Sequence, residues 1–94
     1  MRSGEAFAFV DIAATTAPFY VTVGGIYGAD YAATFGGGSI TLEKRAADGV
    51  TYVPVATAVT ANGAQIVYLP PGWYEFVIVT ATAVYIQLTR IPME

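Results

Sequence analysis

The 94-residue chain has no cysteine and no histidine, and it has few charged residues. The missing cysteines exclude disulfides, and the absence of both residue types removes the usual ligands of zinc and iron–sulfur sites. Charged residues make up 12% of the sequence, whereas globular domains carry about 25%. The four basic residues are too few to neutralise a run of phosphates. We therefore expect no metal, no cofactor and no nucleic-acid partner.

Long uninterrupted apolar runs are also missing, which bears on targeting. Arg2 precedes an apolar stretch that could begin a signal peptide, but Glu5 lies before that stretch and Asp11 lies inside it. The hydrophobic region of a signal peptide is continuous. No segment approaches the roughly 18–20 apolar residues of a spanning helix without an intervening glycine, proline or aspartate. The sequence predicts a soluble, unexported protein with no membrane partner.

Residues that favour β-strands, above all valine, isoleucine, threonine, tyrosine and phenylalanine, dominate what is present. Apolar residues make up 55% of the chain, and ten glycines and five prolines divide them into short segments. This spacing is typical of sandwiches, jelly rolls and small barrels. We predict an all-β fold, a single jelly-roll-like antiparallel β-sandwich of about eight strands over residues 1–94, with a barrel as the open alternative. The strands are expected at 6–14, 19–23, 31–35, 39–45, 51–56, 65–69, 73–80 and 83–91.

Turn residues and alternation add detail to these segments. Asp48-Gly49 predicts a hairpin turn, and Pro54 marks the return strand as an edge strand, because proline cannot donate to a ladder. In the first segment, Ile12 is placed on the face opposite to the two phenylalanines. The glycine-rich stretch 24–38 is expected to be a bent or mobile connection. The residues expected to point to one side of the last two strands are Tyr74, Phe76 and Ile78, then Val84, Ile86 and Leu88.

With histidine and cysteine absent, catalysis would depend mainly on carboxylates. The sharpest arrangement is Glu43 with Glu75 on neighbouring strands, as in a glycosidase pair. Both residues suit solvated strand faces better, and a small sandwich offers little depth for a substrate cleft. The loop 36–39 lacks the Lys-Ser/Thr of a nucleotide loop and leads into a strand. We predict that the protein is not an enzyme.

Aromatic residues point to a binding function instead. Trp73 and Tyr74 could form stacking platforms for a sugar, with Asn62 or Gln65 as hydrogen-bonding partners. Alternatively, the aromatic side chains fill the core and cover contacts between copies, because tyrosine and tryptophan are enriched at interfaces. The second interpretation is favoured, and the first stays open.

The segment from Gly38 to Pro92 carries a series of turn motifs in a fixed order. The motifs are Ser39-Ile-Thr-Leu-Glu, Asp48-Gly-Val-Thr-Tyr-Val-Pro-Val55, Thr60-Ala-Asn-Gly63, Leu69-Pro-Pro-Gly-Trp-Tyr74 and Thr82-Ala-Val-Tyr85. In this order they resemble small β-sandwich proteins of tailed bacteriophages that decorate or cement the capsid or form head fibres. The N-terminal third of the chain has no such pattern.

The resemblance implies a non-enzymatic virion structural protein, made in the host cytoplasm and located on the capsid surface. Its partners would be the major capsid protein and further copies of itself, as a homodimer or homotrimer, and it would stabilise capsomer junctions. The alternative is a carbohydrate- or receptor-binding module of a phage fibre or surface protein. Because the N-terminal third is apolar and nearly uncharged, we expect it to face the partner. The residues expected to make this contact are Phe7, Phe9, Phe19, Tyr27, Tyr31 and Phe35.

Overall fold

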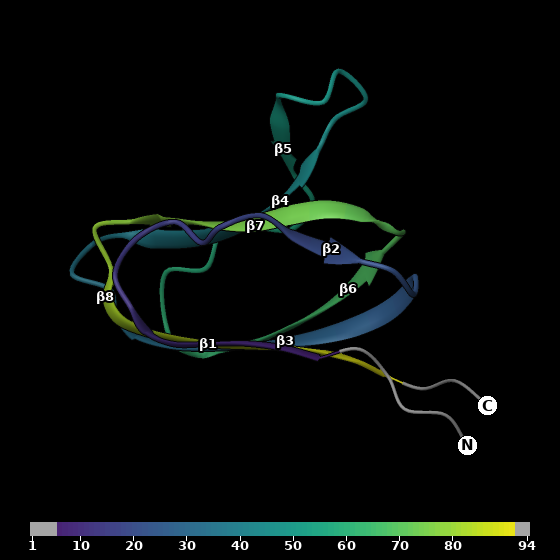
Figure 1. The fold of residues 1–94 in the computed structure, drawn as a ribbon. Helices are drawn as coiled ribbons and strands as arrows, with labels where there is room; N and C mark the ends of the chain where they lie inside the picture. Colours follow the sequence, from purple (N-terminus) through teal and green to yellow (C-terminus); the bar gives the residue numbers. More distant parts are fainter. Residues whose placement is uncertain (1–5, 92–94) are drawn as a thin grey trace.

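The computed structural model describes residues 6–91, which form eight strands in two antiparallel sheets (Figure 1). Sheet A has the strand order β1-β8-β3-β6, and sheet B has the order β2-β7-β4-β5. The two sheets lie one above the other, which confirms the predicted all-β sandwich. The strands are β1 (Ala6–Ile12), β2 (Phe19–Val21), β3 (Gly25–Thr34), β4 (Ser39–Arg45), β5 (Tyr52–Pro54), β6 (Gly63–Leu69), β7 (Gly72–Val79) and β8 (Thr82–Arg90).

The strand pairs are nested in the sequence. β4 pairs with β5, β3 with β6, β2 with β7 and β1 with β8, and successive pairs lie in alternate sheets. The chain therefore behaves as one long hairpin that is wound across two layers. This arrangement places Ala6, at the start of β1, directly opposite Thr89, near the end of β8.

The core lies between the sheets and is rich in aromatic rings. Phe76 of β7 is fully buried. Its ring centroid lies 5.6 Å from that of Phe9, 5.7 Å from that of Phe19 and 5.9 Å from that of Tyr31. These contacts join both sheets, since Phe9 and Tyr31 belong to sheet A. The buried apolar residues are Val21, Tyr27, Ala29, Tyr31, Ile40, Leu42, Leu69, Tyr74, Phe76, Ile78, Ala81, Val84, Ile86 and Leu88.

The glycine-rich stretch differs from its prediction, because most of it forms β3, a central strand of sheet A. Tyr27, Ala29 and Tyr31 alternate into the core, and β3 is hydrogen-bonded on both sides, to β6 and β8. Pairing and burial on this scale outweigh the entropic cost of glycine in a strand. The tight bend is confined to Gly36-Gly37, where both residues have positive φ values of 56° and 84°.

The first strand contains a β-bulge that the alternation pattern did not reveal. Phe9 lies opposite Ile86, but Ile12 lies opposite Val84, so β1 carries one extra residue between these two pairs. Asp11 lies in this interval with a φ of 53°. The bulge returns Ile12 to the inward face, where it packs against the core. The predicted position of Ile12 on the face opposite to Phe7 and Phe9 is therefore wrong, because all three side chains pack against the core.

The hairpin of β4 and β5 projects away from the sandwich on the side of sheet B (Figure 1). As predicted, β5 is an edge strand and contains Pro54. The Asp48 carboxylate accepts hydrogen bonds from the backbone N–H of Val50 at 2.8 Å and of Thr51 at 2.9 Å, and from the Thr51 hydroxyl at 2.6 Å. These donors, the hydroxyl first, lower the pKa of Asp48 to about 2. The turn is therefore held by its own residues, independently of the core.

Candidate interaction surfaces

The residues expected to contact a partner point into the sandwich instead. Tyr27 and Tyr31 are only 0% and 4% exposed, and the tyrosine hydroxyls donate to the Val23 carbonyl and to Gln65 Oε1. Burial raises the pKa of Tyr31 well above its usual value. The partly buried side chains Phe7, Phe9, Phe19 and Phe35 pack against the core. The interpretation of these six side chains as the partner-facing surface is therefore wrong, because they fill the space between the two sheets.

The outward residues of sheet A form a broad apolar surface, which we call the sheet A face. Among them, Ile66, Tyr68, Val10 and Tyr85 are 69%, 68%, 66% and 48% exposed. Asp30 is the only charged residue at these outward strand positions, and the bulged Asp11 lies at the edge. The face consists of Ala6, Ala8 and Val10 from β1, Ala83, Tyr85, Gln87 and Thr89 from β8, Ile26, Gly28, Asp30 and Ala32 from β3, and Ala64, Ile66 and Tyr68 from β6.

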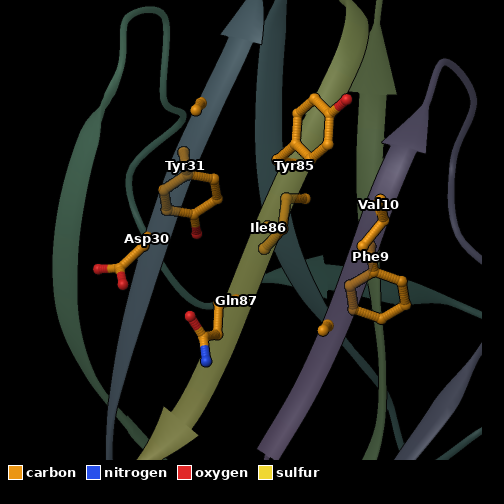
Figure 2. Close-up of a pocket in the computed structure, with 9 residues that line it drawn as sticks. Phe9, Val10, Asp30, Tyr31, Tyr85, Ile86 and Gln87 are labelled. Atoms are coloured by element: carbon orange, nitrogen blue, oxygen red, sulfur yellow. The ribbon is translucent and has the colours of Figure 1, made fainter.

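A shallow depression of about 400 Å³ lies on the sheet A face, across β1, β8 and β3. Figure 2 shows Tyr85 and Gln87 on the middle strand between Val10 on one side and Asp30 on the other. The low relief follows from the small side chains of Ala8 and Ala32, which belong to the lining. Such a surface offers contact area and little enclosure, so it is suited to another macromolecule rather than to a small substrate.

The outward residues of sheet B, which we call the sheet B face, have a different character. At one end, Tyr20, Trp73, Arg45 and Tyr52 form a row across the four strands. The ring centroid of Trp73 on β7 lies 5.2 Å from that of Tyr20 on β2, in an edge-on arrangement. On the opposite side of β7, the guanidinium carbon of Arg45 on β4 lies 5.3 Å from the Trp73 ring centroid. The face consists of Tyr20, Trp73, Glu75, Val77 and Val79, Ser39, Thr41, Glu43 and Arg45, and Tyr52 and Pro54.

Glu43 and Glu75 lie directly opposite each other on this face, one row away from Trp73. Partial burial, and then the facing Glu43 carboxylate, raise the pKa of Glu75. The sequence reasoning paired these two residues correctly as neighbours. Their position on an open strand face favours the solvated interpretation over a glycosidase pair. The described residues contain no group of three or more acidic residues that could hold a metal ion.

The two aromatic residues proposed for sugar stacking lie on opposite sides of β7. Trp73 is 38% exposed, whereas Tyr74 is 0% exposed and its hydroxyl donates to the Pro70 carbonyl at 2.6 Å. Tyr74 therefore cannot be a stacking platform, because alternation along β7 turns it into the core. Desolvation raises its pKa to about 12. Tyr20 and Arg45, the actual neighbours of Trp73, were missed, since the sequence does not state the registers that bring them together.

The polar partners proposed for a sugar are also engaged within the fold. The Asn62 Oδ1 accepts a hydrogen bond from the backbone N–H of Ala33 at 2.9 Å. The Gln65 side chain accepts from Tyr31 and donates to the Thr57 carbonyl at 2.7 Å. Both amides therefore stabilise connections at the β6 edge.

The fold and its two outer faces place the chain in the class of two-layer antiparallel β proteins. Comparisons with family models, with curated proteins and with solved structures found no match to this chain. Residues 6–91 contain no helix of the length and hydrophobicity needed to cross a membrane.

Proposed function

We propose that this protein is a non-enzymatic virion structural protein, a capsid decoration or cement protein that attaches to the shell of the major capsid protein through the sheet A face. The observation that carries the proposal is the composition of that face, which has one charged residue, Asp30, at its outward strand positions. A solvated antiparallel face normally alternates with polar residues. An apolar face of this breadth is stabilised when a neighbour covers it.

The nested strand pairing supports the same proposal. We assign this order to the jelly-roll type, an architecture used by viral capsid proteins and by lectins. The order of turn motifs between Gly38 and Pro92, which resembles phage decoration proteins, is a separate line of support. In this proposal the protein is located on the capsid surface and stabilises the junctions between capsomers by the area that each copy buries.

A second copy of the chain is the other proposed partner, in a homodimer or homotrimer. A groove of about 530 Å³ follows the edge strand β6, and its lining includes the exposed apolar side chains of Ile66 and Tyr68. Contact between copies along this edge would hide it from unrelated strands. We expect light scattering to report a dimer or trimer, and a monomer at every concentration would contradict this part of the proposal.

Co-sedimentation with empty shells of the major capsid protein tests attachment. Tyr85 on the sheet A face and Val79 on the sheet B face are 48% and 52% exposed, so Tyr85→Glu and Val79→Glu form a matched pair. Burying an unpaired carboxylate costs more than the about 1.4 kcal/mol that corresponds to a tenfold loss of affinity. We expect Tyr85→Glu to lower the attachment affinity at least about tenfold and Val79→Glu to leave it unchanged.

Salt provides a second readout of the same experiment. Attachment through apolar contacts should change by less than about threefold between 0.1 and 0.5 M NaCl, because screening acts on charges. Wild-type protein that ignores the shells, equal loss in both variants, or removal by moderate salt would each contradict attachment through the sheet A face.

A further inference from the structure

The row on the sheet B face has the composition of a binding site, and attachment through the opposite face leaves it uncovered. Tyr20 lies opposite Trp73 in the β2–β7 pair, and Arg45 lies opposite Tyr52 in the β4–β5 pair. Tryptophan, tyrosine and arginine are the residue types that dominate binding energy at recognition surfaces. Four strands thus contribute one row of aromatic and guanidinium side chains to one end of the sheet.

The Trp73 side chain is held in place before any ligand arrives. Tyr20 packs edge-on against its ring at 5.2 Å, and Arg45 lies 5.3 Å from the ring centroid. Trp73 nevertheless remains 38% exposed, and Tyr20 is 43% exposed. A ring that is already ordered loses little conformational entropy on binding, so its exposed surface is an efficient platform.

Hydrogen-bonding groups lie one row away from the platform. Glu43 and Glu75 are directly opposite each other, and such pairs have Cβ atoms about 4.5–5.5 Å apart. Within the described part of the chain, neither carboxylate forms a hydrogen bond or ion pair with a side chain. The row and the adjacent carboxylate pair together offer an apolar ring surface, acceptors from Glu43 and Glu75, and a donor from Arg45.

We infer that the sheet B face binds a neutral saccharide, with a pyranose ring packed on Trp73 and Tyr20 and its hydroxyls bound by Glu43, Glu75 and Arg45. A pyranose has an apolar C–H surface, which complements the aromatic rings of the row, and hydroxyls that both donate and accept, which complement Arg45 and the two carboxylates. A hydroxyl can also donate to a carboxylate without bringing a charge to the interface. A protein partner would have to desolvate both carboxylates and pair them with cations, which is costly.

The presence of one tryptophan in the sequence makes the site directly observable. The full-length protein is applied to an array of immobilised neutral hexose and N-acetylhexosamine oligosaccharides, and the best binder is titrated in solution while Trp73 fluorescence is recorded. We expect saturable binding with a change in Trp73 fluorescence. Loss of the platform in Trp73→Ala should weaken binding at least about tenfold, as for a central binding residue.

Two further variants keep the inference falsifiable if Trp73→Ala folds poorly. Glu75→Gln preserves the shape of the row and should weaken binding about threefold to tenfold, because it replaces a charged acceptor. Tyr85→Ala removes an aromatic ring of similar exposure from the sheet A face and should leave binding unchanged. Thermal unfolding checks that each variant is folded.

Several outcomes would overturn the inference. Absence of binding to every neutral saccharide, binding of cationic peptides or anionic glycans alone, or binding without a change at Trp73 would each do so. Failure here is distinguishable from failure of the proposed function, because Trp73→Ala is expected to attach to shells as the wild type does, while Tyr85→Glu is expected to bind saccharide and lose the shell.

Discussion

The two outer faces of this sandwich are built on the same alternation, yet they differ in chemistry. The sheet A face has one charged residue, Asp30, at its outward strand positions and small residues around a shallow depression. The sheet B face has a packed aromatic–arginine row and two facing carboxylates. An outward position in a strand therefore does not make a residue polar. The sheet A face is suited to a broad apolar contact, and the sheet B face is suited to binding specific chemical groups, so a protein of this size has surfaces for two different partners.

The largest expected effect comes from disrupting the aromatic core that packs the two sheets together. Phe76 is fully buried and its ring contacts aromatic rings of both sheets. Phe76→Ala should lower the free energy of unfolding by about 3–5 kcal/mol, because it leaves a cavity in the core. Urea denaturation measures the loss. The outward-facing neighbour variant Val77→Ala is the control, and a similar loss in that variant would show that the core is not centred on Phe76.

A smaller effect should separate the two faces directly. Tyr20 and Tyr85 are 43% and 48% exposed, but of these two only Tyr20 packs against another aromatic ring of the described residues, that of Trp73 at 5.2 Å. Tyr20→Ala should therefore cost about 0.5–1.5 kcal/mol more than Tyr85→Ala in the free energy of unfolding. Equal costs, measured by denaturation of both variants, would mean that the row on sheet B is not packed.

The smallest effect concerns the facing carboxylates. Burial and Glu43 raise the pKa of Glu75 in the folded protein, so the folded state holds this proton more tightly than the unfolded chain does. The free energy of unfolding therefore falls at this residue as pH rises from the unfolded pKa of Glu75, about 4.3, through its higher folded pKa.

Glu75→Gln removes this penalty and should stabilise the protein at pH 7 by roughly 0.2–0.5 kcal/mol, a small value because solvent screens the pair. The gain should disappear below about pH 3, where Glu75 is protonated in both states. Denaturation curves at the two pH values check both statements, and a gain that persists in acid would exclude charge repulsion as its cause.

The sequence was most informative where local pattern and local turns act together. The bounds of β4, Ser39–Arg45, were predicted to the residue, because strict alternation runs between a glycine stretch and a hairpin turn. It was least informative for β3, whose glycines indicate a loop until β6 and β8 pair with it on both sides. The six inward aromatic residues were misplaced for a related reason, since low charge in a segment does not say which face its side chains take.

The candidate site depends even more strongly on long-range structure. Trp73 was named as an alternative sugar-stacking residue from its type alone. Its neighbours Tyr20 and Arg45 come from strands far away in the sequence. Only the registers of β2 and β4 against β7, and of β5 against β4, bring the row together. The Glu43–Glu75 pair could be anticipated because β4 and β7 both alternate cleanly, which leaves few ways to align them.

The nested order of the strand pairs predicts the order in which the strands pair as the chain folds. Of the described pairs, only β4–β5 joins consecutive strands, through residues such as Arg45 and Tyr52. Every other pair encloses a longer loop, whose closure costs entropy and slows folding. β1 is synthesised first among the strands and must wait for β8. In the folded protein β1 is an edge strand of sheet A, and the bulge at Asp11 interrupts the regular spacing of its free backbone groups, which hinders pairing with neighbouring chains.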